Sequence, residues 1–504
     1  MAYYERLSAL DASFLGLEDD NCHMHVGGVL IFENGPLGMP GGGVDIDRIR
    51  RSIEARLHMV PRFRQRLAYI PYEGIPVWVD DDRFRLAYHV RHTALPHPGD
   101  ERQLKRMVGR IQSQALDRRR PLWEMWIVEG LAGGRFALVS KTHHCLIDGV
   151  SGADLMAVLQ SPFPDSEDAV PEPWTPRPRP TPARLVFDEA VRRAGQPFVL
   201  ARNIADAMED PAAAAARLLD AAVGLAEAFA PAFAPTSETP INVEVGPHRR
   251  FDWTVMRVAD LKAVKNVLGG TLNDVVLAVV SGALRKFFAQ RGVDPDALDI
   301  RAGVPVSVRG ADQHGQLGNR VTQMQASLPV RLADPVARLE AVTETLKGLK
   351  ESKQALGGEV LSAISDFTVP NVLVQSVRMA SRARPYNLIV TNVPGPQIPL
   401  YLQGARMLTS YPVVPLFQNL AIVVGLFSYN GGLYWGINAD WEMIPDLHVF
   451  IEAIESSFRE LQEAAGRRVE QPTTVGRRAA PRAAKTRRPV RPLRAVEPRA
   501  AARE

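Results

Sequence analysis

The chain has 504 residues, of which 46% are hydrophobic and 23% are charged. That length exceeds what one hydrophobic core usually supports, so we expect two packed domains, and the composition excludes a largely disordered protein. The formal net charge of +4 is unevenly distributed, because residues 466–504 hold twelve Lys and Arg against three Glu, a net charge of +9. The basic character therefore belongs to the tail, and the preceding 465 residues are slightly acidic.

Cysteine content and hydropathy bear on the compartment. Cys22 and Cys145 are too few for a disulfide framework, so a reducing cytoplasm is expected. The N-terminus has scattered acids and lacks the apolar core of a secretory signal. The most hydrophobic stretch, from Tyr411 to Ile437, is interrupted by prolines and an Asn-Gly-Gly turn, so it predicts buried strands and not a membrane-spanning helix.

The first 160 residues alternate between strand and helix patterns. The segment MHVGGVLIF predicts a strand within 22–32, and residues 44–67 have helical spacing. The runs LWEMWIVEGL and RFALVSKTHH are β-rich and are joined by Gly133 and Gly134, which is typical of a hairpin. The second hairpin strand ends in two histidines.

The remainder divides by composition. Proline and acid density marks a linker from Ser161 to Pro182, and the Ala-rich segment 183–230 predicts two or three helices separated at Pro197 and Pro211. These helices are expected to pack on the body, bridge the domains or lie on a membrane. A second α/β unit follows. The predicted division is an N-terminal domain 1–160, a linker with helices 161–242, a C-terminal domain 243–465 and a disordered basic tail 466–504.

Two adjacent histidines, His143 and His144, are the candidate catalytic residues. Imidazole is the side chain whose unperturbed pKa suits a general base near neutral pH. Neighbouring residues of a strand point to opposite faces, so only one histidine is expected to face a reaction centre. Asp148 lies four residues beyond His144, and Gly149 permits a tight backbone reversal. Asp148 is therefore expected to hold the turn through a buried ion pair.

The residues by themselves leave three other interpretations open. Two histidines and an acid within six residues are also typical of a core pair or of metal ligands. Cys145 is a candidate nucleophile that His144 would activate, although strand alternation directs the thiol away from the same pocket. The third possibility is an apolar body that binds lipid without chemistry.

An ordered set of short motifs runs through most of the chain. The set comprises LSALDASFL (7–15), MHVG (24–27), PLW (121–123), HHCLIDG (143–149), Asn273-Asp274, PVSVR (305–309), Gly318-Asn319 and TNVPGP (391–396). Together they resemble the bacterial wax ester synthase/diacylglycerol acyltransferase family, whose HHxxxDG and PLW motifs are complete here. A bare HxxxDG also occurs in chloramphenicol acetyltransferases, plant alcohol acyltransferases and peptide-synthetase condensation domains. The specificity of the resemblance therefore comes from the ordered set.

The resemblance implies an α/β (α+β) fold of two chloramphenicol-acetyltransferase-like domains with an active-site tunnel between them. CoA is expected to enter one mouth and the acceptor alcohol the other. It further implies that His144 is the general base, that His143 supports it and that Asp148 is structural. Arg309 is the expected partner of Asp148 by analogy with related acyltransferases, and a solvated charge at a strand end is the alternative.

Three further residues are expected in substrate binding or structural support. Asn273 and Asp274 open a predicted helix, where either residue is a favoured cap. If that helix begins at the domain interface, its terminus would help to position substrate or hold the second domain against the histidine motif. Trp123 belongs to a residue type that is found more often in cores than in ligand contacts. No metal ligand is expected at the site.

The expected reaction is the acylation of diacylglycerol or a long-chain alcohol by acyl-CoA, without a metal or organic cofactor, because a thioester is already activated. One alternative is a condensation-type acyltransferase that takes its acyl group from a carrier protein. Another is a non-catalytic protein of lipid droplets or the inner membrane surface, using the Ala-rich helices and the cationic tail. Membrane contact is expected to be peripheral. The tail lacks aromatic residues that would stack on bases, so no nucleic-acid partner is expected.

Overall fold

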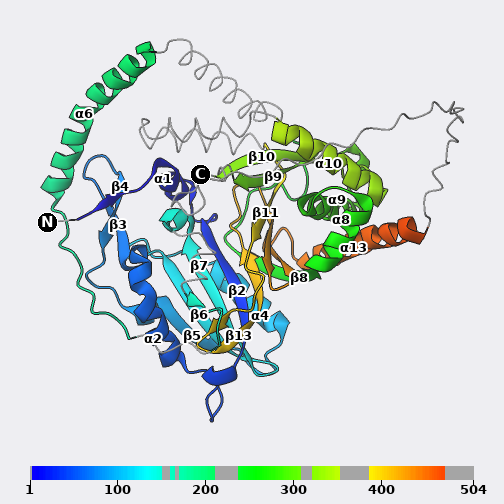
Figure 1. Cartoon of the computed structure of the whole chain (residues 1–504), viewed down its shortest axis with the longest axis horizontal. Coiled ribbons are helices and arrows are strands. Elements are labelled where there is room, and N and C mark those ends of the chain that lie inside the picture. The colour runs from blue at the N-terminus through cyan, green and yellow to red at the C-terminus, as the bar shows by residue number, and fades with distance from the viewer. Residues whose placement is uncertain are drawn as a thin grey trace, which may run out of the picture.

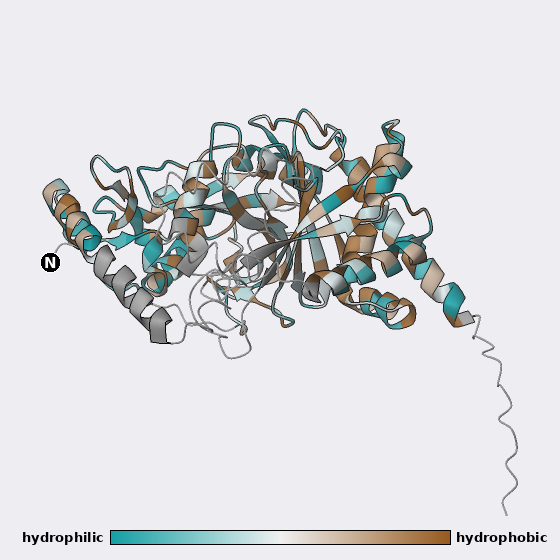
Figure 2. Ribbon diagram, turned by 90° about the horizontal axis from the view of Figure 1, so that it is seen from above, coloured by the Kyte–Doolittle hydropathy of each residue, from teal (hydrophilic) through white to brown (hydrophobic). Residues whose placement is uncertain are grey.

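The computed structural model describes residues 3–149, 159–164, 170–209, 236–307, 321–351 and 385–470, which form two lobes side by side (Figure 1). Each lobe is built on a six-stranded sheet. Each sheet contributes buried hydrophobic residues to a core, and helices pack against it. Figure 2 shows hydrophobic, brown segments among these strands and helices. The protein therefore has a mixed α/β architecture with two cores.

The sheet of the N-terminal lobe has the strand order β12-β13-β2-β7-β6-β5. Its strands are β2 (His25–Glu33), β5 (Val90–Ala94), β6 (Trp123–Leu131), β7 (Arg135–His143), β12 (Tyr401–Leu402) and β13 (Ala405–Val413). The helices of this lobe are α1 (Ala9–Leu17), α2 (Ile46–Arg56), α3 (Leu86–His89) and α4 (Glu101–Gln112). The predicted hairpin is confirmed, because β6 and β7 pair antiparallel and Gly133 and Gly134 turn between them with positive φ.

Two strands of this sheet come from far along the chain. The strand β13 pairs antiparallel with β2, with Val413 opposite Gly27, and it lies among the strands of the N-terminal lobe in Figure 1. It also contacts the sheet of the other lobe at a point where only glycine fits. A Cβ on Gly436 would lie 1.9 Å from the carbonyl oxygen of Pro412. Strand β13 therefore joins the two lobes through a backbone contact.

The sheet of the C-terminal lobe has the order β10-β9-β11-β14-β15-β8. Its strands are β8 (Arg249–Arg257), β9 (Ile300–Ser307), β10 (Val321–Leu328), β11 (Leu388–Pro394), β14 (Ile422–Tyr429) and β15 (Gly432–Asp440). Its helices are α8 (Val258–Leu268), α9 (Leu272–Gln290), α10 (Pro335–Glu351) and α13 (Leu447–Glu470). The hydrophobic residues of α9 are almost entirely buried in the core of this lobe. The stretch from Tyr411 to Ile437 forms buried strands, as its interruptions predicted.

A small third sheet anchors a long helix. The strands β1 (Glu5–Arg6), β4 (Pro76–Asp80) and β3 (Gln65–Tyr69) form it in that order. The helix α6 (Pro182–Glu209) begins beside it and extends away from the lobe in Figure 1. Leu185 packs against this sheet, and Glu189 pairs with Arg6 of β1. The first turns of α6 are therefore fixed to the N-terminal lobe.

Several predicted element ends were wrong for identifiable reasons. The predicted helix 44–67 is the shorter α2, which ends at Arg56 and is followed by a 3₁₀ turn, Leu57–Met59. The helical pattern cannot continue beyond this turn, because Val60 precedes Pro61 and has non-helical backbone angles. The predicted break at Pro197 does not occur, since α6 runs through it to Glu209, and Pro211 lies outside the described residues. Helix α13 extends to Glu470, into the segment expected to be disordered.

No single helix among the described segments is long and apolar enough to span a membrane. The consecutive helices α8 and α9 meet the length and composition criteria only as a pair, and they are bent by 95° relative to each other.

Candidate active site

The two histidines of the HHCLIDG motif lie where strand β7 ends. His143 is the last residue of β7, and His144 begins a 3₁₀ turn, η4 (His144–Gly149). The backbone N–H of His143 donates to the carbonyl of Leu122, at 2.9 Å, and that of His144 donates to the carbonyl of Met24, at 2.8 Å. Both neighbouring chain segments therefore fix the backbone of this motif.

The side chain of His143 is completely buried. Its Nδ1 accepts a hydrogen bond from the backbone N–H of Cys145, at 3.2 Å, and its Nε2 lies 3.4 Å from the carboxylate of Glu18. Because Nδ1 is an acceptor in this arrangement, the neutral ring carries its proton on Nε2, facing the carboxylate. His143 thereby ties the beginning of η4 to Glu18.

Glu18 lies at the C-terminal end of α1 and is the centre of a buried polar cluster. Arg118 donates to its carboxylate through Nε, at 3.0 Å, and the rings of His25 and His23 lie 3.5 and 3.9 Å from it. Burial alone would raise the pKa of Glu18, but interactions with His143 and with the positively charged Arg118 hold that pKa at about 2. The carboxylate is therefore ionised at neutral pH.

The histidines flanking Glu18 are held in the neutral form. Burial, with a further contribution from the charge of Lys141, lowers the pKa of His25 well below its usual range. Burial likewise lowers the pKa of His23, in spite of the nearby carboxylate. Arg118 is consequently the main cation that compensates Glu18, and the cluster forms a fixed polar support behind the motif.

His144 has a different environment. Its ring stacks on that of Phe14 of α1, with the centroids 3.8 Å apart and the planes inclined by 24°. The side chain is only partly buried, whereas that of His143 has no exposed surface. His144 therefore retains exposed surface that His143 lacks.

The alternative roles for this segment can be judged from the same geometry. Cys145 is buried, and burial raises the pKa of its thiol well above the usual range, so the reactive thiolate is strongly disfavoured. Within the described part of the chain, no group of three or more His, Cys, Asp or Glu side chains is placed to hold a metal ion. A Cys145 nucleophile has no support in this arrangement.

Trp123 is a core residue in this structure. Its ring is fully buried and stacks between Phe63 and His89, with centroid distances of 4.6 Å to each. Its indole N–H donates to the carbonyl of Phe63, at 2.8 Å. The tryptophan of the PLW motif therefore stabilises β6, next to the strand that ends in the histidines.

Asn273 and Asp274 lie in the first turn of α9, but neither is its cap. Thr271 is the N-cap, and its hydroxyl accepts from the backbone N–H of Asp274, at 3.2 Å. The carboxylate of Asp274 accepts in return from the backbone N–H of Thr271, at 2.9 Å. This reciprocal capping box gives Asp274 a local structural role.

Three predicted residues lie partly or wholly outside the described region. The backbone of Asp148 and Gly149 forms the end of η4, but their side-chain surroundings and the whole of Arg309 are not described. The ion pair between Asp148 and Arg309, like the tunnel between the domains, stays a prediction.

Local sequence patterns did not indicate which residues would surround the histidines. Glu18 belongs to an acidic run, Glu-Asp-Asp, that reads as solvated surface, and Arg118 opens a run of three arginines. Phe14 falls within the LSALDASFL motif, which marked the segment but not its contact with His144. The available signal was the motif alone, because the contacts join residues about 100 positions apart.

Family comparisons agree over most of the chain. Residues 7–276 match the model of the wax ester synthase/diacylglycerol acyltransferase catalytic domain, and residues 317–462 match that of the WS/DGAT C-terminal domain. The chain is 34% identical to the probable diacylglycerol O-acyltransferase tgs1 of Mycobacterium tuberculosis. That alignment spans 467 residues, 92% of this chain and 96% of the relative.

Solved structures show the same architecture. The wax ester synthase/diacylglycerol acyltransferase of Marinobacter aquaeolei VT8 matches with a TM-score of 0.65 and 27% identity, over 92% of this chain and all of that one. The first condensation domain of the calcium-dependent antibiotic synthetase matches with a TM-score of 0.56 and 18% identity, over 92% and 96%. The latter similarity concerns the fold alone.

Proposed function

Because this chain belongs to the wax ester synthase/diacylglycerol acyltransferase family and is therefore an O-acyltransferase, we propose that it esterifies diacylglycerol with acyl-CoA, using His144 as general base. Long-chain alcohol is the second acceptor class of the proposal. The observation that carries the choice of base is the contrast between the two histidines. His143 is buried against Glu18, whereas His144 is partly exposed on the ring of Phe14.

The proposed reaction is a single displacement. His144 takes the proton of the acceptor hydroxyl, and the oxygen attacks the thioester carbonyl, so that a carbon–oxygen bond forms and a tetrahedral oxyanion results. Collapse of this intermediate breaks the carbon–sulfur bond and releases CoA thiolate. The thiolate takes the proton back from His144, which restores the neutral base. The products are ester and CoA, and the step balances without a further reactant.

The buried cluster supports this role for His144 by fixing its backbone. Rigid placement of a catalytic group converts an encounter into an oriented contact, which is a large part of the rate advantage of enzymes. The carbonyl of Met24, the residue before β2, accepts a hydrogen bond from the backbone N–H of His144, and the carboxylate of Glu18 lies 3.4 Å from the ring of the preceding residue, His143. The backbone that carries His144 is therefore restrained in position.

The proposed function can be tested with purified protein. Palmitoyl-CoA is offered with dipalmitoylglycerol, with hexadecanol or without acceptor, while CoA release is followed and the lipid products are separated by chromatography. We expect acceptor-dependent release of CoA with triacylglycerol as the main product. Ester formation from a carrier-bound acyl donor, but not from palmitoyl-CoA, would instead assign the condensation-type alternative.

We also propose that the enzyme contacts the cytoplasmic membrane surface or lipid droplets peripherally, since its acceptor is insoluble. Exposed apolar side chains on α6 support this proposal: Phe187 and Val191, one helical turn apart, are 61% and 56% exposed. The cationic contribution is expected from the Arg-rich tail. Amphipathic surfaces of this kind bind lipid through buried apolar area and cationic flanks.

The membrane contact is tested by sedimentation with phosphatidylglycerol vesicles. We expect the double variant Phe187→Ser/Val191→Ser, or truncation after Glu470, to reduce the bound fraction at least about threefold, because each removes apolar area or positive charge. Turnover with detergent-solubilised acceptor should stay unchanged. The control is Tyr72→Ser, which removes an exposed aromatic ring elsewhere on the lobe. Equal vesicle binding by all proteins would contradict the proposal.

A further inference from the structure

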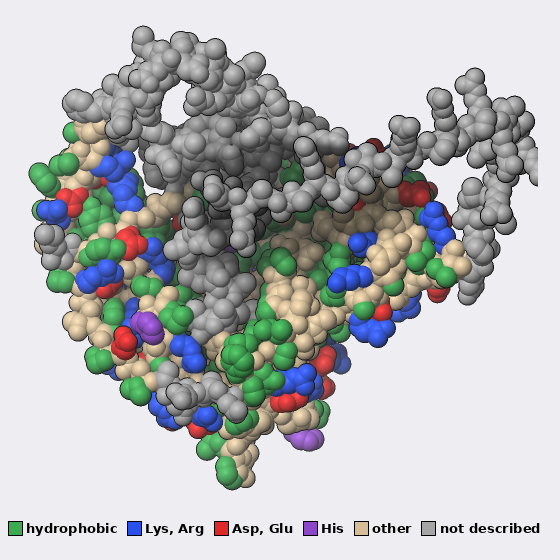
Figure 3. Space-filling view, in the orientation of Figure 1, with side chains coloured by type: hydrophobic (Ala, Val, Ile, Leu, Met, Phe, Trp, Pro, Cys, Tyr) green, Lys and Arg blue, Asp and Glu red, His purple; other side chains and the backbone are tan. Residues whose placement is uncertain are grey.

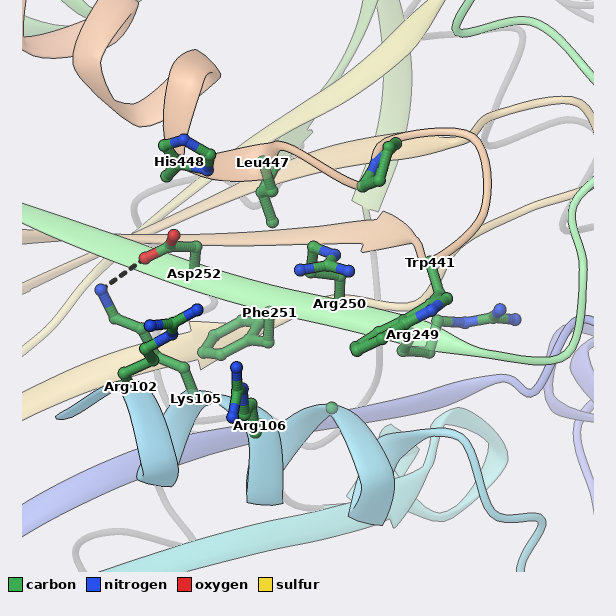
Figure 4. Close-up of a pocket in the computed structure, with 12 residues that line it drawn as sticks. Arg102, Lys105, Arg106, Arg249, Arg250, Phe251, Asp252, Trp441, Leu447 and His448 are labelled. Carbon is green, nitrogen blue, oxygen red and sulfur yellow. Dashed lines mark ion pairs between the residues drawn. The ribbon is translucent and has the colours of Figure 1, made fainter. Parts of the chain in front are cut away.

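A basic cavity lies at the junction of the two lobes, outside the histidine motif. It has a volume of about 480 Å³ and is bounded by α4, by the beginning of β8 and by the segment that joins β15 to α13. Its main cationic lining residues are Arg102, Lys105, Arg106, Arg249 and Arg250. We call it the α4–β8 cavity. Figure 4 shows the cationic side chains of α4 projecting toward β8.

Charge in this cavity is not balanced by the protein. Five cationic side chains line it together with one carboxylate, that of Asp252, which is already paired with Lys105 at 2.5 Å. Over the described part of the chain, no carboxylate forms an ion pair with Arg102, Arg106 or Arg250. On the face that Figure 3 shows, basic side chains lie beside acidic ones at several places.

The surroundings of Arg250 disfavour its positive charge. Burial, followed by the charge of the neighbouring Arg106, lowers the pKa of Arg250. Arg250 is held by stacking on Trp441, with its guanidinium 3.9 Å from the ring centroid. Like charges gathered in a partly buried concavity attract and orient a multivalent anion, because the field there is focused and weakly screened.

One lining residue of the cavity, Arg249, also contacts the segment that follows Glu18. Arg249 is buried, and its guanidinium donates to the backbone carbonyl of Asn21, three residues from Glu18. The backbone N–H of Arg249 donates to Ser113, at the end of α4. Arg249 therefore links the wall of the cavity to the chain segment beside the Glu18 cluster.

We propose that the α4–β8 cavity binds the phosphate groups of an adenosine 3′,5′-bisphosphate moiety, the anionic end of CoA. This assignment rests on the proposed use of acyl-CoA and adds the site at which its nucleotide is recognised. Guanidinium groups match phosphate oxygens in geometry and charge. The indole of Trp441, 40% exposed at the rim, offers an apolar surface to the base, and the cavity volume is in the range of small-molecule sites.

The test uses the full-length protein and the double variant Arg102→Gln/Arg106→Gln. Both arginines are exposed on α4, and glutamine preserves helix propensity, so the fold should be retained. We expect calorimetric titration with adenosine 3′,5′-bisphosphate to show at least tenfold weaker binding by the variant. In turnover, its KM for palmitoyl-CoA should rise at least fivefold while kcat at saturation changes less than twofold, because the contact is uniform in ground and transition states.

The matched control is Arg110→Gln/Arg257→Gln. It removes two exposed charges, one from α4 and one from β8, at positions that do not line the cavity. We expect it to bind adenosine 3′,5′-bisphosphate like the wild type. Equal affinity of the cavity variant and this control would overturn the assignment. So would a cavity variant that binds the nucleotide normally but loses binding to phosphatidylglycerol vesicles, because the phosphate recognised would then be a lipid headgroup.

Failure of the proposed function gives a different result. If the wild type forms no ester but binds adenosine 3′,5′-bisphosphate through Arg102 and Arg106, the nucleotide site stands and the transferase proposal falls. If ester forms while the variant keeps its normal Kd and KM, the cavity assignment falls alone. The two proposals are therefore tested separately.

Discussion

Replacing His144 with alanine should lower the rate of ester formation at least about a hundredfold, since a general base typically contributes two to four orders of magnitude. The loss should appear in kcat, because proton removal is needed only in the transition state. The measurement is CoA release from palmitoyl-CoA with dipalmitoylglycerol, supported by chromatography of the product. Since the His144 side chain is partly exposed and packs on one side of Phe14, the free energy of unfolding measured in urea should change little.

The control for this variant is His58→Ala, which removes an exposed histidine from the surface beyond α2. It should turn over at the wild-type rate. The variant His143→Gln should retain more activity than His144→Ala, because in our proposal His143 holds the motif and does not exchange a proton with substrate. Retention of full activity by His144→Ala would assign the base elsewhere and remove the central part of the proposed mechanism.

The second large effect is expected from Glu18→Gln. Glutamine preserves the shape of the side chain but removes the charge that Arg118 and His143 face in a buried setting. Breaking a buried ion pair by removing one partner costs about 3–5 kcal/mol, and the partial exposure of Arg118 reduces this to roughly 2 kcal/mol. We expect kcat to fall at least about tenfold with KM nearly unchanged, because η4 loses its anchor while the substrate contacts remain.

The pH dependence of stability provides a second measurement for Glu18. Its folded-state pKa of about 2 lies below the unfolded value near 4.3, so its stabilising contribution is complete above about pH 4.3. The contribution is lost as the pH falls from there toward 2. As the pH falls through this range, the free energy of unfolding measured in urea should therefore decrease less for Glu18→Gln than for the wild type. The exposed neighbour Asp20→Asn is the control, and identical pH profiles for wild type and Glu18→Gln would contradict the assigned cluster.

Local patterns were sufficient for the elements that carry the motif. The alternation of hydrophobic residues and the Gly133-Gly134 turn predicted the β6–β7 hairpin, and so the strand that presents His143 and His144. The same reasoning predicted α9 and the buried strands after Tyr411. These features depend on neighbours within a few residues, and for that reason a single sequence reveals them.

The helix ends were less predictable because they depend on capping. Asn273 and Asp274 both have the chemistry of a cap, yet the structure uses Thr271 and places Asp274 in the reciprocal position. Which residue becomes the N-cap depends on where the first unpaired backbone N–H groups of the helix lie. A shift of one or two residues in the start of the helix changes that position. Propensity alone does not resolve it.

The tertiary structure decided how distant segments meet. The sequence by itself determined an α/β protein with a histidine motif at a strand end and, through the ordered motifs, its family. It did not determine that β13 would join the N-terminal sheet beside β2, because a strand pattern specifies which faces are apolar and not which partner it pairs with. Nor did it determine that Glu18 would be buried, since an acidic side chain near the surface normally stays in water. Burial became favourable only when folding brought Arg118 and His143 to the same carboxylate.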